Sequence, residues 1–150
     1  QYGLRKYDLL LVEGHANVRE IGRCAMVFDN AEGLLFQNHL FRLRPISMDS
    51  YFSLFCLNSH YARKYWEANC STSSGLNTIN RRMLGKMKLC VPEIKEQRAI
   101  VSVLNAQNIH IDAEKQNLAK MKKLKSGLMH DLLTGKVRVA IAPEETTHGR

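Results

Sequence analysis

Pro92-Glu93-Ile94-Lys95-Glu96-Gln97 opens the stretch that decides the fold, and Leu132-Leu133-Thr134-Gly135-Lys136 closes it. Between these two motifs the pattern is helical for roughly forty residues, and apolar side chains recur about every 3.5 residues. A soluble helix of this length cannot bury its apolar stripe against a small globular core. We therefore expect the helix to join, space or dock something, and the chain to be part of an assembly.

The apolar stripe of this helix has the spacing of a coiled-coil interface. Polar residues interrupt it at Gln107–Asn108 and at Glu114–Lys115. Such residues lower the stability of a coiled coil but can fix its register and its partner. Gly135 is the expected stop of the helix, and lysines near its end suit the helix dipole. The predicted interface residues are Ile100, Leu104, Ile111, Leu118, Met121, Leu128 and Leu132.

Upstream of the helix, apolar runs alternate with turn residues, which is typical of a small domain that mixes strands and helix. A helix is predicted over 50–67, with Asp49 or Ser50 as its cap, and Asn80 is placed to cap a second, short helix. Strands are predicted over 7–12, 21–27, 35–43 and 87–91, and polar loops over 13–20 and 69–80.

These patterns predict an α+β fold class, a small mixed sheet-and-helix domain followed by a long C-terminal coiled-coil helix. The predicted domain covers residues 1–91, the helix covers 92–139, and a flexible tail covers 140–150. The chain starts at Gln1 and enters a strand within a few residues, which leaves open that it is a piece of a longer protein.

Net charge and hydrophobicity limit the possible functions but do not identify one. The net charge is +8, from 22 Lys and Arg against 14 Asp and Glu. A basic excess of this size favours contact with a polyanion, although a solvated basic surface explains it equally well. No apolar run approaches the roughly 20 residues that span a bilayer, so we expect no membrane association.

Cysteine usage and missing motifs argue against catalysis. No pair of cysteines has C-x-x-C spacing, so we expect reduced, structural cysteines in apolar surroundings and a cytoplasmic protein. The sequence has no phosphate-binding glycine loop, no nucleophile elbow and no histidine pair that would hold a metal. We therefore expect a chain that is not an enzyme by itself and that needs no cofactor or metal. The cysteines are Cys24, Cys56, Cys70 and Cys90.

Several short motifs, in this order, resemble the target recognition domain of the specificity subunit of type I restriction-modification systems. The resemblance continues into that family's spacer helix and covers nearly the whole chain. The motifs lie at 8–14, 21–25, 37–45, 74–80, Pro92-x-x-x-Glu96-Gln97-x-x-Ile100, and Lys125-x-Gly127-Leu128-Met129-x-x-Leu132-Leu133-Thr134-Gly135-Lys136.

The resemblance implies a non-catalytic DNA-specificity subunit, or a fragment of one. A complete subunit has two recognition domains, each reading one half of a split double-stranded DNA target, and two helices that pack antiparallel as a spacer. Its implied partners are methyltransferase (modification) subunits, which supply cofactor and catalysis, and a restriction subunit that joins through the complex. This chain has one helix, so the implied partner of the helix is a second copy or a second specificity half.

Two segments offer side chains that suit DNA. Arginine can read guanine, asparagine adenine and glutamate cytosine, while hydroxyls and amides suit phosphates. A solvated turn is the competing reading for the first segment, and turn chemistry with helix capping for the second. The predicted DNA-binding residues are His15, Asn17, Arg19, Glu20, Arg23, Ser74, Asn77, Thr78, Arg81 and Arg82.

Other side chains have structural readings that we prefer. Asn38 and His39 are predicted to lie in a strand and to bond their own scaffold. The aromatic residues Tyr61, Tyr65 and Trp66 have helical spacing, which is more typical of core than of base stacking. The lysine cluster is a solvated face or a contact for an acidic partner or DNA, and it contains Lys120, Lys122, Lys123 and Lys125.

Two other functions remain open at this point. The chain can be a coiled-coil interaction module that binds protein and no DNA, or the recognition end of a fused restriction-methylation enzyme. Salt-dependent binding to duplex DNA separates the first alternative from DNA reading.

Overall fold

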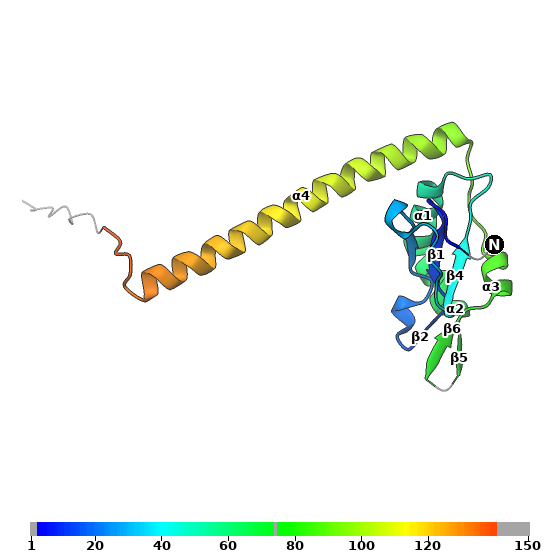
Figure 1. The fold of residues 1–150 in the computed structure, drawn as a ribbon, viewed down its shortest axis with the longest axis horizontal. Helices are drawn as coiled ribbons and strands as arrows, with labels where there is room; N and C mark the ends of the chain where they lie inside the picture. Colours follow the sequence, from blue (N-terminus) through cyan, green and yellow to red (C-terminus); the bar gives the residue numbers. More distant parts are fainter. Residues whose placement is uncertain (1–2, 74, 141–150) are drawn as a thin grey trace, which may run out of the picture. The chain divides into compact units, whose positions relative to one another are not determined.

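The computed structural model describes residues 3–73 and 75–140 (Figure 1). The chain forms two compact units, Gln1–Leu104 and Asn105–Arg150, which we describe separately. The first unit, here called the head, holds the strands and short helices. The second holds most of a long helix. The fold class predicted from the sequence is confirmed. Of the tail predicted over 140–150, residues 141–150 lie outside the described part.

Two small antiparallel sheets form the framework of the head. One consists of β1 (Leu9–Val12), β3 (Cys24–Met26) and β4 (Leu40–Leu43) in the order β3-β1-β4. The other consists of β2 (Gly14–His15), β5 (Ser71–Ser73) and β6 (Leu76–Thr78) in the order β2-β6-β5.

Glu13 connects the two sheets. Its amide donates to the carbonyl oxygen of His39 over 2.8 Å, and its carbonyl oxygen accepts from the amide of Ile79 over 2.9 Å. Because these neighbours flank β4 and β6, the two sheets are held at fixed positions within the head.

The helix predicted over 50–67 is wrong as a single element, because two helices occupy this segment. These are α1 (Ser50–Asn58) and α2 (His60–Asn69), separated by Ser59 in an extended conformation. The hydroxyl oxygen of Ser59 accepts from the amide of Ala62 over 3.2 Å and caps α2. A serine that caps a helix from its own side chain competes with helix continuation, and this explains the break.

The two predicted helix caps are confirmed. The Asp49 carboxylate accepts from the amides of Tyr51 and Phe52 at the start of α1. Asn80 accepts from the amide of Met83 over 2.9 Å at the start of α3 (Arg81–Lys86).

Several predicted strands and loops need correction. The strand predicted over 35–43 begins only at Leu40, because His39 has a left-handed φ of 73° that breaks the extended run. The strand predicted over 21–27 is shortened to β3, since Gly22 has a φ of 66°. Residues 87–91 form no strand. The loops predicted over 13–20 and 69–80 contain β2 with the 3-10 turn η1 (Val18–Glu20), and the hairpin of β5 and β6.

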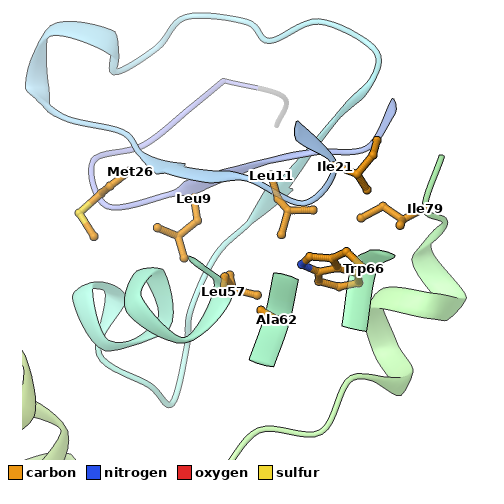
Figure 2. Packing of buried hydrophobic residues seen from close by; sticks show 8 residues of the cluster. All are labelled: Leu9, Leu11, Ile21, Met26, Leu57, Ala62, Trp66 and Ile79. Carbon is orange, nitrogen blue, oxygen red and sulfur yellow. The ribbon is translucent and has the colours of Figure 1, made fainter. Parts of the chain in front are cut away.

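The core of the head lies between the β3-β1-β4 sheet and helices α1 and α2 (Figure 2). Trp66 of α2 is fully buried and lies beside Leu11, Ile21 and Ile79. The core reading of Trp66 is therefore confirmed. Tyr65 is half-buried, and its hydroxyl donates to the carbonyl oxygen of Met83 over 2.8 Å. Tyr61 of the same helix is 54% exposed.

Gln97 anchors the first turn of the long helix α4 (Ile94–Leu133) to the head. Its side chain is 1% exposed. The amide oxygen accepts from the backbone N–H of Asp49 over 2.9 Å, and Nε2 donates to the carbonyl oxygen of Pro92 over 2.7 Å. These two bonds explain the glutamine of the Pro92-to-Gln97 motif in physical terms, because they fix how the chain enters α4 beside α1.

Replacing Gln97 with alanine should therefore destabilise the head. Two hydrogen bonds are lost and two partly buried backbone groups lose a partner, so we expect a loss of about 2 kcal/mol in the free energy of unfolding. Urea unfolding followed by the fluorescence of Trp66, the only tryptophan of the chain, measures it. Gln116→Ala, at an exposed position of the same helix, is the control. An equal loss in both variants would contradict the anchoring role.

The second unit presents the apolar stripe of α4 to solvent. Ile111 is 48% exposed, Leu118 56% and Met121 54%. The helix stops where the sequence predicts, since Gly135 has a φ of 72° and its amide donates to the carbonyl oxygen of Leu132 over 3.3 Å. Among the helices of residues 3–73 and 75–140, none is both long and apolar enough to cross a bilayer.

Candidate nucleic-acid interface

Strand pairing brings together the two segments that the sequence offers for DNA contact. β2 pairs with β6 so that Gly14 lies opposite Thr78 and His15 opposite Asn77. The hairpin of β5 and β6 and the short strand β2 lie side by side in the head (Figure 1). More than sixty positions separate these segments in the sequence, so their convergence is a result of the fold.

Several predicted DNA-binding side chains are already used inside this surface. Asn77 Nδ2 donates to the carbonyl oxygen of Ala16 over 2.7 Å, and its Oδ1 accepts from the hydroxyl of Thr72 over 2.8 Å. Asn17 Oδ1 accepts from the amide of Arg19 over 3.0 Å and caps η1. His15 Nδ1 accepts from the amide of Asn17 over 3.0 Å. These contacts shape the loop, as the competing structural reading expected.

Arg63 of α2 binds the backbone of the same loop, at and just after η1. Its guanidinium donates to the carbonyl oxygens of Arg19 and Ile21. Glu20 and Arg23 form an ion pair in which Arg23 Nη1 lies 2.7 Å from Glu20 Oε2. The charges of Glu20 and Arg23 therefore offset each other, whereas the backbone that carries Arg19 is fixed by the half-buried guanidinium of Arg63. Nothing in the local sequence indicates this role of Arg63, because its partners lie 42 and 44 positions earlier.

Three arginines of the predicted set remain available for an anion. In the described part of the chain, no hydrogen bond or ion pair engages the guanidinium groups of Arg19, Arg81 and Arg82. All three residues are exposed. Arg81 and Arg82 begin α3, only a few positions after β6. Free guanidinium groups near a polar hairpin can neutralise phosphates. Ser74 lies outside the described residues.

The prediction for Asn38 and His39 is wrong. Both side chains are exposed in a turn before β4, and they do not lie in a strand. His39 has a left-handed φ of 73°, and histidine is among the residues that adopt this backbone more often than most, as turns require.

In the part of the chain that the structure describes, none of the cysteines belongs to a group of three or more potential metal ligands. Burial raises the pKa of the Cys24 thiol to about 12, with a smaller opposing effect of Arg63. Burial also raises the pKa of Cys56. Cys90 is exposed and is therefore not a core residue, but its surroundings are apolar, because it lines a groove together with Phe52 and Phe55.

The fold defines a class of protein in which a small head, with a polar surface at β2 and β6, is followed by a long helix with an exposed apolar stripe. Residues 1–123 match the model of the type I restriction modification DNA specificity domain, and the chain belongs to this family.

Known relatives agree with this membership. The chain is 26% identical over 140 residues to a protein named as the MjaX specificity subunit of a type I restriction enzyme of Methanocaldococcus jannaschii, covering 89% of this chain and 33% of that protein. It is 31% identical over 103 residues to the StySPI specificity subunit of a type I restriction enzyme of Salmonella potsdam, covering 67% and 22%. The chain thus spans a third or less of these relatives.

A solved structure has the same fold. The crystal structure of a type I restriction-modification system S subunit from M. genitalium superposes with a TM-score of 0.60 at 16% identity. The match covers 87% of this chain and 33% of that chain. The arrangement of a head followed by a long helix is therefore one that this family uses.

Proposed function

We propose that the chain is a DNA sequence-specificity module, or a fragment of one, that reads one half of a split DNA target and serves as a non-catalytic part of a methyltransferase-restriction complex. One observation carries the proposal. In a chain of the DNA specificity family, the pairing of β2 with β6 joins both candidate segments into one surface.

Some residues of the proposed surface shape its loop, and others are free to bind DNA. Asn17 and Asn77 shape the loop through their internal hydrogen bonds. Arg19, Arg81 and Arg82 have free guanidinium groups that can bind phosphates or a guanine edge. His15, Glu20, Arg23, Ser74 and Thr78 complete the proposed set.

The long helix is proposed as the spacer of the module. Its 40 residues extend about 60 Å at 1.5 Å per residue. This exceeds one turn of duplex, about 34–36 Å, so two heads at the ends of such a spacer would read two separated half-sites. We propose that the helix pairs with a second copy or a second specificity half, and that its flanks dock methyltransferase subunits, through which a restriction subunit joins. A cytoplasmic location is part of this proposal.

Replacing Arg81 and Arg82 together with alanine should weaken binding to duplex DNA at every sequence. Each lost phosphate contact is expected to reduce the slope of log K against log salt by about 1, so the double variant should lose about 2. Fluorescence anisotropy of a labelled random duplex, titrated at several salt concentrations, measures the slope.

The control removes the same charge elsewhere. Arg5 and Arg98 are exposed and lie outside the proposed surface, so Arg5→Ala with Arg98→Ala should leave the salt slope nearly unchanged. Equal slopes for both double variants would exclude Arg81 and Arg82 from the interface. Absence of binding even at low salt would favour the alternative, a coiled-coil module that binds only protein.

A further inference from the structure

Two charged residues interrupt the apolar stripe of α4. Following the stripe at alternating steps of three and four gives a seam within the second unit. Its members are Gln107, Ile111, Glu114, Leu118, Met121, Lys125, Leu128 and Leu132. Glu114 and Lys125 are exposed, and within the described residues neither takes part in an ion pair or a side-chain hydrogen bond. Each therefore lacks a partner at a position that a coiled coil would bury.

We propose that two copies of this chain pair antiparallel along this seam in one register, in which Glu114 of each copy faces Lys125 of the other. The inference rests on the helix pairing proposed above and adds what selects the partner and the register. The two breaks in the stripe become the specificity elements of the interface.

The register follows from the spacing of the seam together with the matching of its two charged residues. In an antiparallel coiled coil, each a position of the heptad faces a d position of the partner helix. If Glu114 faces Lys125, then Leu118 faces Met121 and Ile111 faces Leu128. Both charges meet an opposite charge, and the layers between and beside them are apolar. The two-fold symmetry produces the charge pair twice in each dimer.

Other arrangements leave the charges unmatched. Parallel, in-register pairing places Glu114 against Glu114 and Lys125 against Lys125. An antiparallel shift by one heptad places Glu114 against Leu118 or Leu132, so a carboxylate is buried among apolar groups without a partner. Removing the partner of a buried charge costs several kcal/mol, whereas a matched polar layer is a known device for fixing register.

The surface of α4 is shaped for such a partner. Met121, Lys125, Leu128 and Leu132 line a shallow, mostly apolar groove together with Leu124. In the proposed register this groove receives Glu114, Ile111 and Leu118 of the second copy, with charge opposite charge.

The proposed pairing uses only the part of α4 in the second unit. Ile100 and Leu104, which the sequence predicts as further interface positions, line a groove of the head together with Phe52 and Phe55. The paired segment then extends over about 28 residues, or about 42 Å at 1.5 Å per residue. That length is enough for four heptads, which is typical of a stable coiled coil.

Two single charge reversals test the register in the full chain. Glu114→Lys places two like-charged pairs in the dimer, and so does Lys125→Glu. We expect each variant alone to bind its own copy about 100-fold more weakly than wild type. An equimolar mixture of the two variants should recover wild-type affinity, because each mixed dimer again has two opposite-charge pairs. Sedimentation equilibrium measures all four samples.

Two controls change charge on the opposite side of the helix. Lys123→Glu and Gln116→Lys alter exposed positions that lie outside the seam, and both should dimerise like wild type. If wild type dimerises but the reversals have no effect, or their mixture shows no recovery, the register is wrong while helix pairing stands. If wild type remains a monomer at the highest concentration measured, helix pairing itself fails and the register with it.

Discussion

Replacing Gly22 with alanine is expected to remove a large share of the stability of the head. Gly22 has a φ of 66°, and a Cβ atom added there would lie 2.3 Å from Cδ1 of Trp66 and 2.4 Å from Nε1. A left-handed backbone costs an L-residue about 1–2 kcal/mol. Overpacking a rigid, buried ring costs about 1–3 kcal/mol more. The total of about 2–5 kcal/mol is a large share of the roughly 5–15 kcal/mol that stabilises a domain.

A matched glycine separates the two costs. Gly33 has a φ of 81°, and a Cβ atom there would meet nothing within 4 Å. Gly33→Ala should therefore show only the backbone term, about 1–2 kcal/mol. Urea unfolding followed by Trp66 fluorescence compares the two variants. Equal destabilisation would contradict the steric role of Trp66 behind the Ile21-Gly22-Arg23 motif.

Replacing Asp8 with asparagine is the second change with a large expected effect. The Asp8 side chain is fully buried, and its two carboxylate oxygens accept from Nε and Nη2 of Arg44, each over 2.6 Å. Oδ2 also accepts from the amide of Arg5 over 2.8 Å. The pair ties the start of β1 to the end of β4. Asparagine removes the charge that accepts these bonds in a buried site, and Arg44, whose side chain is 35% exposed, loses its ion-pair partner. We therefore expect the midpoint of thermal unfolding to fall by about 10 °C.

The same pair predicts how stability depends on pH. Burial alone would raise the pKa of Asp8, but the hydrogen bonds from Arg44 and Arg5 and the charge of Arg44 outweigh it and lower the pKa. A carboxyl whose pKa is lower in the folded state stabilises the fold above its unfolded pKa of about 3.9. This stabilisation is lost as the pH falls through the lower, folded-state pKa.

Asp8→Asn should therefore lose stability at neutral pH and show a flatter decline below about pH 4 than wild type. Asp29→Asn is the control, because Asp29 is 73% exposed in its ion pair with Lys6. An exposed pair contributes little, so this control should shift the midpoint by about 2 °C or less. A steep acid-induced loss that persists in Asp8→Asn would assign the pH dependence to another group.

The sequence predicted elements best where their cause is local. Asp49, Asn80 and Gly135 mark helix ends through their own side-chain or backbone chemistry, and the structure confirms each of them. The long helix was predictable because its periodicity persists over many turns. The break at Ser59 cannot be predicted from the apolar spacing, because that spacing fits one continuous helix and the cap made by the serine hydroxyl separates α1 from α2.

The remaining features depend on contacts between residues far apart in the sequence. Asp8 and Arg44 lie 36 positions apart, and Gln97 lies 48 positions from Asp49. No local sequence pattern predicts which residues form such long-range pairs. The candidate interface has the same character. The sequence shows that each segment has side chains suited to DNA contact, but only the strand pairing shows that His15 and Asn77 are neighbours. Their internal hydrogen bonds reduce the set of side chains free for DNA mainly to arginines.

Selection from a pool of random duplexes tests most directly whether this chain reads DNA sequence. The full chain is immobilised, and the bound duplexes are amplified and sequenced over several rounds. A pair of heads related by two-fold symmetry predicts enrichment of one short half-site in inverted repeat, with a constant gap between the copies. The Arg81→Ala, Arg82→Ala variant should recover far fewer duplexes. A folded wild-type chain that enriches no sequence over the input pool would contradict the account.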